Sequence, residues 1–482
     1  MYKNKKLVRF NTTKSTVSQL ALAGSDLVCF MLGPVLALAV IALLWGQTQR
    51  YLPADELLPR FSAHAVLALC CVAWFWGRLR HYTYRKPFWF ELKEILRTIV
   101  IFSIIDLAIL AFSKGHVSRY LWAFTWAWVA LWVPVSRAVV KRWLARSGLW
   151  LKDCVIIGTG PNAIEAYKAL NGEKELGLRF KYFFAPQPIE AKHLEGLRVV
   201  SQEKTLWRTT DPRHTQYVIA LEDGQEHLRE QWVQKMALQH CRVVSVVPTL
   251  RGIPLNSTDA SYLFRYELLL LKINTNLTRP TARAIKRSMD LVLASLILLA
   301  LSPVLLIVVL WIMKDGGSPI YKHERIGRDG KAFGCLKFRS MVLNSDEVLQ
   351  QLLATDPQAR AEWEKDFKLR NDVRITRVGH ILRKTSLDEL PQLWNVIRGE
   401  MSLVGPRPVV AEELERYGDN QGYYLMASPG MTGLWQVSGR NDVDYETRVY
   451  FDAWYVKNWS LWNDWVILFK TVQIVLHRNG AY

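Results

Sequence analysis

The chain has 482 residues, half of them hydrophobic, with 62 Lys and Arg against 43 Asp and Glu and a formal net charge of +19. This length exceeds that of one ordinary domain, and the long apolar runs exclude a wholly soluble protein. The basic residues gather beside the apolar segments, where they would meet anionic headgroups, so we expect membrane lipids and no nucleic acid as partners.

Four apolar segments occupy residues 1–145, and each is near the ~20 residues that cross a bilayer core. Basic residues precede the first segment, separate the second from the third and follow the fourth, which places both ends of the group on the cytoplasmic side. No small-residue cleavage pattern follows the basic N-terminus, so the first helix is expected to be retained. We therefore predict a bundle of four transmembrane helices, over Val17 to Trp45, Phe61 to Trp76, Ile95 to Phe112 and Tyr120 to Val140.

Two carboxylates, Asp26 and Asp106, fall inside these apolar segments. Ionisable residues within a membrane are costly, so they either serve a function or pair with another polar group. The sequence leaves both interpretations open for these two residues.

Residues 146–265 consist of short β-branched runs separated by helix-like stretches, which is typical of a Rossmann-like α/β module with a parallel sheet. The first run leads into Gly158 to Ala163, close to a dinucleotide-binding fingerprint. The second strand, however, ends in Phe183 to Pro186, without the usual ribose-binding carboxylate. We therefore favour a regulatory or oligomerising module over a nicotinamide-binding one. The edges of its sheet make a homodimer a hypothesis.

A fifth apolar segment, Met289 to Met313, has basic residues on both sides, so both of its ends are expected in the cytoplasm. Ser302 and Pro303 stand near its middle, where the proline removes one backbone hydrogen bond and kinks a helix. Two halves of about twelve residues each reach only ~18 Å, roughly half of the bilayer. We predict a re-entrant helix over residues 286–314. The alternative, a kinked helix that spans the membrane, would place the C-terminal domain outside the cell.

After this segment, Ser318 to Arg325 and Lys331 to Phe338 flank a glycine-bounded turn and predict a β-hairpin. Arginine binds phosphate oxygens through its planar fork, and lysine acts as a point charge. Arg325, Lys337 and Arg339 are therefore candidate phosphate contacts. Ordinary attraction to lipid headgroups is the alternative for these side chains.

Asp388 and Glu389 are adjacent carboxylates in the most informative stretch of the chain. Ser386 with Glu389 fits a capping box and Asp388 fits an N-cap, so both carboxylates are expected at a helix N-terminus, which favours anions. With Arg383 and Arg407 nearby, the pair suits phosphoryl transfer with Mg²⁺, for which Asp388 and Glu389 would be the ligands. Adjacent acidic residues at a helix start are also common as simple caps, so spacing alone leaves this open.

Four dense motifs follow one another in the C-terminal part, namely Lys337 to Met341, Thr385 to Leu393, Met401 to Pro408 and Pro429 to Val437. In this order they resemble the monotopic phosphoglycosyl transferases, the bacterial sugar transferase family. The likeness runs from about Arg283 to Tyr482. The four preceding helices and the α/β module resemble the large members, which transfer hexose-1-phosphates to a polyprenyl phosphate.

The resemblance implies a catalytic domain over residues 266–482 that contains the re-entrant helix and works in two steps. Asp388 would attack the β-phosphorus of a UDP-sugar and release UMP, and undecaprenyl phosphate would then attack the aspartyl intermediate. Glu389 is carried over as a Mg²⁺ ligand, and Asp464 as a further site residue. The hexose is expected to be galactose, with glucose as the alternative.

The family likeness also implies a location and a pathway. It places the protein in the bacterial inner membrane, with the catalytic domain on the cytoplasmic side, at the start of O-antigen or capsular polysaccharide assembly. Near the C-terminus, Trp465 to Leu476 is too short to span a membrane. This segment either lies in the bilayer interface near the lipid substrate or packs against the protein's own core.

Two other classes of function are weighed against this one. A membrane-anchored dinucleotide sensor or dehydrogenase would bind nicotinamide cofactors tightly and keep its function when Asp388 becomes Asn. A transporter is disfavoured, because the five apolar segments show no internal repeat.

Overall fold

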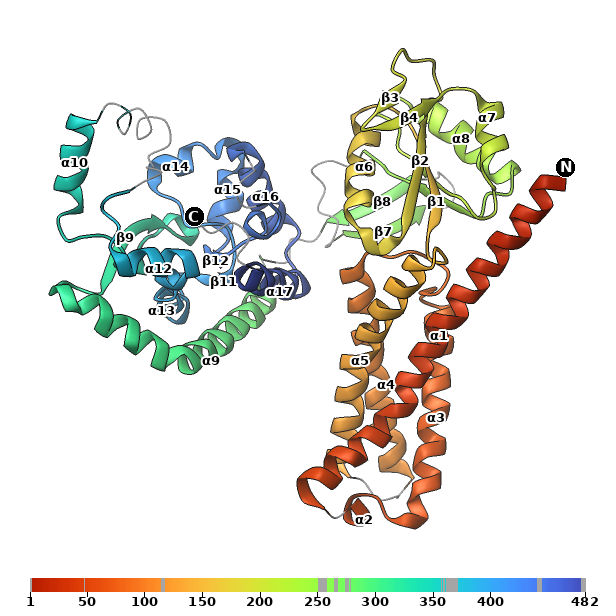
Figure 1. The fold of residues 1–482 in the computed structure, drawn as a ribbon, viewed down its shortest axis with the longest axis horizontal. Helices are drawn as coiled ribbons and strands as arrows, with labels where there is room; N and C mark the ends of the chain where they lie inside the picture. Colours follow the sequence, from red (N-terminus) through yellow and green to blue (C-terminus); the bar gives the residue numbers. More distant parts are fainter. Residues whose placement is uncertain are drawn as a thin grey trace. The chain divides into compact units, whose positions relative to one another are not determined.

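The computed structural model describes residues 2–46, 48–113, 118–249, 258–263, 268–273, 277, 279–356, 358, 360, 372–439 and 444–477. The chain forms two compact units, Met1–Arg251 and Gly252–Tyr482. The first unit contains both the N-terminal helices and the α/β module (Figure 1). The expected boundary between residues 265 and 266 falls outside the described residues.

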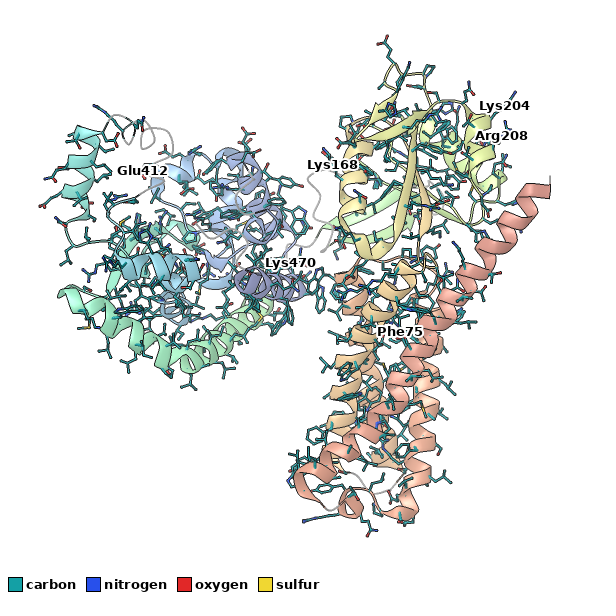
Figure 2. All side chains as sticks on the ribbon, viewed as in Figure 1. Phe75, Lys168, Lys204, Arg208, Glu412 and Lys470 are labelled. Carbon is teal, nitrogen blue, oxygen red and sulfur yellow. The ribbon has the colours of Figure 1, made fainter. Side chains whose placement is uncertain are left out.

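Four long helices of the first unit pack around a shared apolar core. Phe30 and Phe75 are fully buried in this core, and Phe75 lies among the helices in Figure 2. Gly33 lets two of the helices approach closely, because a Cβ there would come within 3.0 Å of the Val129 side chain. The helices are α1 (Tyr2–Trp45), α3 (Ala54–Gly77), α4 (Phe88–Phe112) and α5 (Arg119–Arg146), with the short α2 (Thr48–Tyr51) between the first two.

Within the described residues, five helices are long and apolar enough to cross a membrane. Four of them are α1, α3, α4 and α5, and the fifth is α9 (Pro280–Ile312) of the second unit. Many of their apolar side chains face outward, among them Leu299 and Ile307 of α9. Such surfaces are costly in water, so these helices belong to a membrane-associated protein.

Asp26 and Asp106 are both fully buried and paired with arginines, as the structural interpretation of these two residues expects. Asp106 accepts two hydrogen bonds from the guanidinium of Arg60, at 2.6 and 2.7 Å. Asp26 is paired in the same way with Arg137, at 2.6 Å, and accepts a hydrogen bond from the hydroxyl of Tyr82. Both carboxylates are therefore partnered structural residues that join helices to one another.

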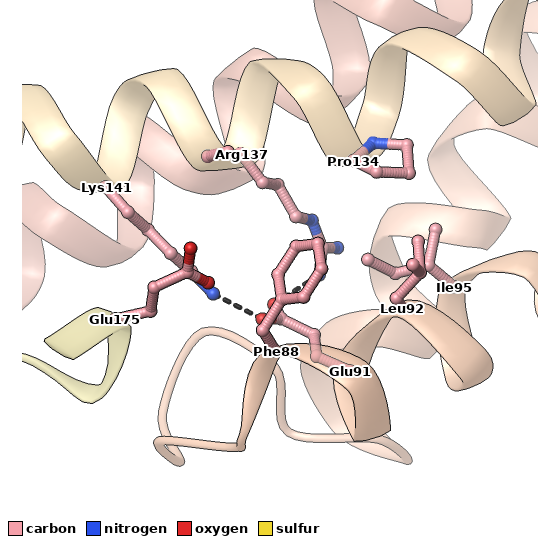
Figure 3. Close-up of a pocket in the computed structure, with 9 residues that line it drawn as sticks. Phe88, Glu91, Leu92, Ile95, Pro134, Arg137, Lys141 and Glu175 are labelled. Carbon is pink, nitrogen blue, oxygen red and sulfur yellow. Dashed lines mark hydrogen bonds and ion pairs between the residues drawn. The ribbon is translucent and has the colours of Figure 1, made fainter. Parts of the chain in front are cut away.

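A small cavity marks the place where α4 and α5 meet the 3-10 turn η1 (Lys174–Leu176) of the α/β module. Figure 3 shows Glu91 of α4 between Arg137 and Lys141 of α5, with Glu175 of η1 beside Lys141. Burial raises the pKa of Glu175, while the charge of Lys141 opposes that shift. The module thus brings the carboxylate of Glu175 close enough to α5 to be affected by the charge of Lys141.

The module contains a sheet in the order β3-β4-β2-β1-β5-β6. Five neighbouring strands are parallel to one another, but β3 is antiparallel to β4. The sheet is therefore mixed, whereas the sequence predicted a parallel sheet. The short β3–β4 connection explains this, because a parallel pair would need a longer crossover. The strands are β1 (Lys152–Ile157), β2 (Leu178–Phe184), β3 (His193–Leu194), β4 (Leu197–Val200), β5 (Gln216–Ile219) and β6 (Val243–Val246).

Helices cover both faces of this sheet. Ala163 and Ala166 of α6 pack on one face, whereas Leu206 of α7 and Trp232 of α8 pack on the other. This layering is that of a doubly wound α/β fold. The helices are α6 (Pro161–Gly172), α7 (Glu203–Thr209) and α8 (Glu226–Leu238).

The second unit has a core built from α9 and the elements after it. The predicted β-hairpin is present and consists of β9 (Ile320–Ile326) paired antiparallel with β10 (Ala332–Phe338). Pro303 lies inside α9, whose ribbon is bent in Figure 1. The other helices are α10 (Ser345–Thr355), α12 (Arg377–Thr385), α13 (Gln392–Arg398), α14 (Ala411–Glu415), α15 (Gln421–Met426), α16 (Tyr445–Lys457) and α17 (Leu461–His477).

Short strands complete this unit. The strands β7 (Thr258–Leu263) and β8 (Leu268–Ile273) form an antiparallel pair, and β11 (Ser402–Val404) and β12 (Gly430–Thr432) form a parallel one. The β11–β12 pair joins two of the four sequence motifs, because Gly405 donates from its backbone N–H to the carbonyl of Thr432.

Candidate active site

Asp388 and Glu389 lie in a tight 3-10 turn, η5 (Leu387–Glu389), between α12 and α13. Ser386 ends α12 with φ of 55°, in the left-handed region, and so reverses the chain before the turn. Pro391 immediately precedes α13, where its missing N–H costs nothing. The two carboxylates are thus fixed by a helix end on one side and a helix start on the other.

The expected capping box at Ser386 is wrong. Ser386 makes no side-chain capping hydrogen bond, and its backbone carbonyl instead accepts the N–H of Glu389 at 3.4 Å. The reason is conformational, because an N-cap residue needs extended backbone whereas Ser386 is the left-handed C-cap of α12.

The two carboxylates differ in their surroundings. The Nζ of Lys337, on β10, lies 2.7 Å from Oε1 of Glu389. Asp388 is half-buried, and burial followed by the negative charge of Glu389 raises its pKa, against the opposing charges of Lys337 and Arg383. Asp388 is therefore a poorly solvated carboxylate held beside two cations. Such a group is a better nucleophile than a fully hydrated one.

The donor set also fits a magnesium ion. Mg²⁺ is commonly bound through one or two carboxylates and completes its shell with water and phosphate oxygens. Asp388 and Glu389 repel one another, as the raised pKa of Asp388 indicates, and a divalent cation would relieve that repulsion. In the described part of the chain, no group of three or more His, Cys, Asp or Glu side chains could hold a metal ion. A shared site would therefore depend on substrate oxygens.

Three of the predicted basic residues gather around one buried thiol. Burial raises the pKa of Cys335, and the charges of Lys337, Arg325 and Arg407 all lower it. The negative charge of Glu389 raises the pKa of the same thiol. All four charges act on the same thiol, so β9, β10, η5 and the loop after β11 bring these side chains into one neighbourhood.

Arg383 and Arg339 have other positions. Arg383 donates from Nε to the hydroxyl of Ser340 at 3.0 Å, and its charge acts on Asp388. Arg339 donates to the carbonyl of Ile312 at 3.2 Å, at the end of α9. Arg383 is thus beside the carboxylates, whereas Arg339 caps the C-terminal end of the membrane-associated helix.

Asp464 lies in a separate buried network. It is paired with Lys286 of α9 at 2.7 Å, and it accepts hydrogen bonds from the Tyr455 hydroxyl at 2.7 Å and the Trp459 ring N–H at 3.0 Å. Lys286 also donates to the carbonyl of Val404. These contacts tie α9 to α17 and to β11. The sequence signal for this ion pair was Lys286, a charged residue at the start of an apolar run.

We expect Asp464→Asn to lower the free energy of unfolding by about 3 kcal/mol, because Lys286 would keep a buried charge without its partner. The double variant Lys286→Met/Asp464→Leu should lose clearly less stability, since neither charge remains. Thermal unfolding in detergent micelles measures both. An Asp464→Asn protein that melts like the wild type yet transfers no sugar phosphate would show instead that Asp464 takes part in the reaction.

The glycine loop of the α/β module holds a carboxylate of its own. Oε1 of Glu222 accepts the backbone N–H of Asn162 at 2.8 Å, at the N-terminus of α6. Gly158, with φ of 135°, and Gly160 line an adjoining cavity of about 180 Å³ together with Glu222. A dinucleotide would bring its pyrophosphate to this helix N-terminus. Glu222 occupies that position, which weighs against nicotinamide binding along with the missing ribose-binding acid.

Residues 281–478 match the model of a protein family described as "Bacterial sugar transferase". A UDP-galactose-lipid carrier transferase of Erwinia amylovora is 54% identical over 98% of this chain and 99% of its own length. An undecaprenyl-phosphate galactose phosphotransferase of Salmonella typhimurium is 52% identical over 98% of this chain and 99% of its own length. A UDP-glucose:undecaprenyl-phosphate glucose-1-phosphate transferase of Klebsiella pneumoniae is 41% identical over 41% of each chain. The chain therefore belongs to the bacterial sugar transferase family.

Proposed function

We propose that this protein transfers galactose-1-phosphate from UDP-galactose to undecaprenyl phosphate and releases UMP. The observation that carries the proposal is the half-buried Asp388, next to Glu389 and within reach of the charges of Lys337 and Arg383. The similarity to two galactose-lipid relatives over nearly their whole length supports the choice of donor and acceptor.

The first step is an attack by the ionised carboxylate of Asp388 on the β-phosphorus of UDP-galactose. A bond forms between a carboxylate oxygen and this phosphorus, while the bond from the phosphorus to the bridging oxygen breaks and UMP leaves with that oxygen. Lys337 and Arg383 stabilise the charge that moves between the oxygens. Arg325, on β9, and Arg407, in the loop after β11, bind the phosphate groups of the donor.

The second step returns the enzyme to its starting state. An oxygen of undecaprenyl phosphate attacks the phosphorus of the aspartyl galactose-phosphate, and the carboxylate oxygen of Asp388 is released. The product carries galactose on a pyrophosphate linkage to the lipid. Dividing the transfer into two steps lets one positioned carboxylate serve two anionic substrates that would otherwise have to meet directly.

Asp388 and Glu389 are the residues that would hold Mg²⁺. When bound there, the ion would neutralise charge on the phosphate oxygens. Glu389 keeps the ammonium group of Lys337 beside these oxygens through their ion pair. Glu389 therefore has two roles, since it would bind the metal and it orients a cation.

The membrane arrangement follows from the apolar helices. We infer that α1, α3, α4 and α5 form a four-helix transmembrane bundle, and that α9 enters the cytoplasmic leaflet and returns at Ser302 and Pro303. The bend of α9, its outward-facing leucines and the basic residues at both of its ends support a re-entrant course. The catalytic domain then lies on the cytoplasmic side of the bacterial inner membrane, where nucleotide sugars are made.

Helix α17 combines the two positions considered for it. Ile467 is buried in the core of the second unit, whereas Trp465, Phe469, Val472 and Leu476 are 37%, 57%, 56% and 73% exposed. These four recur at helical spacing and share one face. We propose that this face rests in the bilayer interface close to the polyprenyl chain.

The lipid-linked galactose would start the assembly of O-antigen or capsular repeat units.

The α/β module would regulate the enzyme or join two copies of it. A mass measurement in native nanodiscs tests the second role, because a homodimer has twice the mass of one chain.

The donor is tested by incubating purified protein with undecaprenyl phosphate, Mg²⁺ and either UDP-galactose or UDP-glucose. We expect transfer from UDP-galactose to be faster by about tenfold or more, since a hydrogen-bonded hydroxyl in the wrong position leaves a polar group unpaired. The formation of radiolabelled lipid-linked sugar over time measures the rate of transfer from each donor. Preferential use of UDP-glucose would establish glucose-1-phosphate transfer, and activity with neither donor would contradict both.

A further inference from the structure

The side-chain amide of Asn395, on α13, bonds to the backbone of β10. Asn395 is fully buried. Its Oδ1 accepts the backbone N–H of Leu336 at 3.0 Å, and its Nδ2 donates to the carbonyl of Gly334 at 2.8 Å. β10 belongs to a sheet of two strands, in which β9 is its partner. The amide therefore bonds to β10 as the backbone of a further strand would.

The orientation of this amide is fixed by a third contact. Nδ2 also donates to Oε2 of Glu400 at 2.6 Å, in the turn after α13. If the nitrogen and oxygen were exchanged, Oδ1 would face the carbonyl of Gly334 and the carboxylate of Glu400, which are both acceptors. Only one orientation of Asn395 thus satisfies the groups around it.

The two elements that Asn395 joins carry opposite halves of the candidate active site. Lys337 is on β10, and Glu389 ends η5 just before α13. The Nζ of Lys337 lies 2.7 Å from Oε1 of Glu389. The distance between cation and carboxylate therefore depends on how β10 and α13 are held together.

Apolar packing alone does not fix this arrangement. Leu393 of α13 and Cys335 of β10 belong to the same buried core, but apolar contacts have no directional preference. A slip of one residue along β10 would move Lys337 by ~3.3 Å and break its ion pair. The hydrogen bonds of Asn395 are directional, so they set the register between the strand and the helix.

We propose that Asn395 is a positioning residue that holds the ammonium group of Lys337 beside Glu389 and the neighbouring Asp388. The assignment deepens the function proposed above and rests on it. Lys337 stabilises charge on the phosphate oxygens during transfer, so the rate depends on where its ammonium group lies. A displacement of about 1 Å in an active site can lower a rate about a hundredfold.

The kinetic test uses Asn395→Gln, which keeps the amide but places it one carbon–carbon bond, ~1.5 Å, farther out. The kcat for transfer from UDP-galactose should fall about ten- to a hundredfold with little change in KM, because the lost interaction belongs to the transition state. In a Lys337→Met background the same substitution should change kcat by less than about twofold, since the group that it positions is gone. A general loss of folding would lower activity equally in both backgrounds.

The position of Lys337 can also be read without turnover. A water-soluble carbodiimide joins an amine to a carboxylate that touches it, so mass analysis should find a Lys337–Glu389 cross-link in the wild type. The pair Lys235 and Glu203, also 2.7 Å apart and in the other unit, is the internal reference. Asn395→Gln should lower the ratio of the first cross-link to the second by about tenfold or more. Absence of sugar transfer by the wild type would leave this result intact and count against the proposed function alone.

Asn458→Gln is the matched control, because Asn458 is also buried in this unit and donates from Nδ2 to the carbonyl of Trp454 at 3.1 Å. It should keep the wild-type kcat and cross-link ratio. Glu400→Ala removes only the third partner of the amide, so it should lower kcat and the cross-link ratio less than Asn395→Gln does. This variant decides the matter if Asn395→Gln does not fold.

Two results would overturn the assignment. One is an equal loss of kcat from Asn395→Gln in the wild-type and Lys337→Met backgrounds. The other is a wild-type cross-link ratio in the Asn395→Gln or Glu400→Ala protein.

Discussion

Replacing Asp388 with asparagine is expected to lower the rate of sugar-phosphate transfer by at least about a thousandfold, the scale of loss when a nucleophile is removed. Asparagine keeps the size of the side chain but cannot form the ester with phosphorus. The half-buried position of Asp388 between Glu389 and the cations should be preserved, so the loss would report chemistry rather than folding.

The intermediate itself can be captured. Protein incubated with Mg²⁺ and UDP-galactose, without the lipid acceptor, should gain the mass of a hexose-phosphate on the peptide that contains Asp388, and the Asp388→Asn protein should not. Asp329→Asn, in the exposed turn of the β9–β10 hairpin, is the control and should gain the adduct normally. Transfer to lipid by the Asp388→Asn protein at the wild-type rate would refute covalent catalysis by this residue.

Arg137→Met is expected to cost about 3–5 kcal/mol of stability, because it leaves Asp26 charged and buried among the helices. Arg137 also contacts Glu91 at 2.9 Å and lies 4.6 Å from the ring centre of Phe75, so one substitution affects α1, α3 and α4 together. Figure 3 shows how far this side chain reaches into the space between the helices. The amount of folded protein extracted from membranes should fall accordingly.

Thermal unfolding in one detergent measures this loss, with Arg142→Met as the control because Arg142 is an exposed cation on the same helix. The double variant Asp26→Asn/Arg137→Met should be more stable than Arg137→Met alone, since the stranded charge is gone. Equal melting temperatures for Arg137→Met and Arg142→Met would mean that the buried pair contributes nothing to stability.

The sequence predicted the elements whose structure depends on residues close together in the chain. Alternation and glycine-bounded turns located the β9–β10 hairpin. Apolar length located the five long helices. The pair Asp388 and Glu389 stood out because two adjacent carboxylates among basic residues are chemically distinctive.

Contacts between distant residues could not be found in this way. Lys286 and Asp464 are 178 positions apart, and only the folded chain shows that they neutralise each other. The same holds for Tyr417, in the turn after α14, and Asp452, on α16. The error at Ser386 has a different source, because both a capping box and a left-handed helix end are compatible with its side chain. Ser386 ends α12 in the left-handed conformation and is followed by the short turn η5, so the helix end prevailed over the capping box.

The carboxylate of Glu222 gives the α/β module an independence that a nucleotide-binding relative would lack. By accepting the N–H of Asn162, it satisfies the start of α6 with an atom of the chain itself. A helix start that is satisfied from within needs no bound phosphate to keep its shape. The glycine loop can therefore serve as a fixed point of the module, whether the module regulates the enzyme or joins two copies of it.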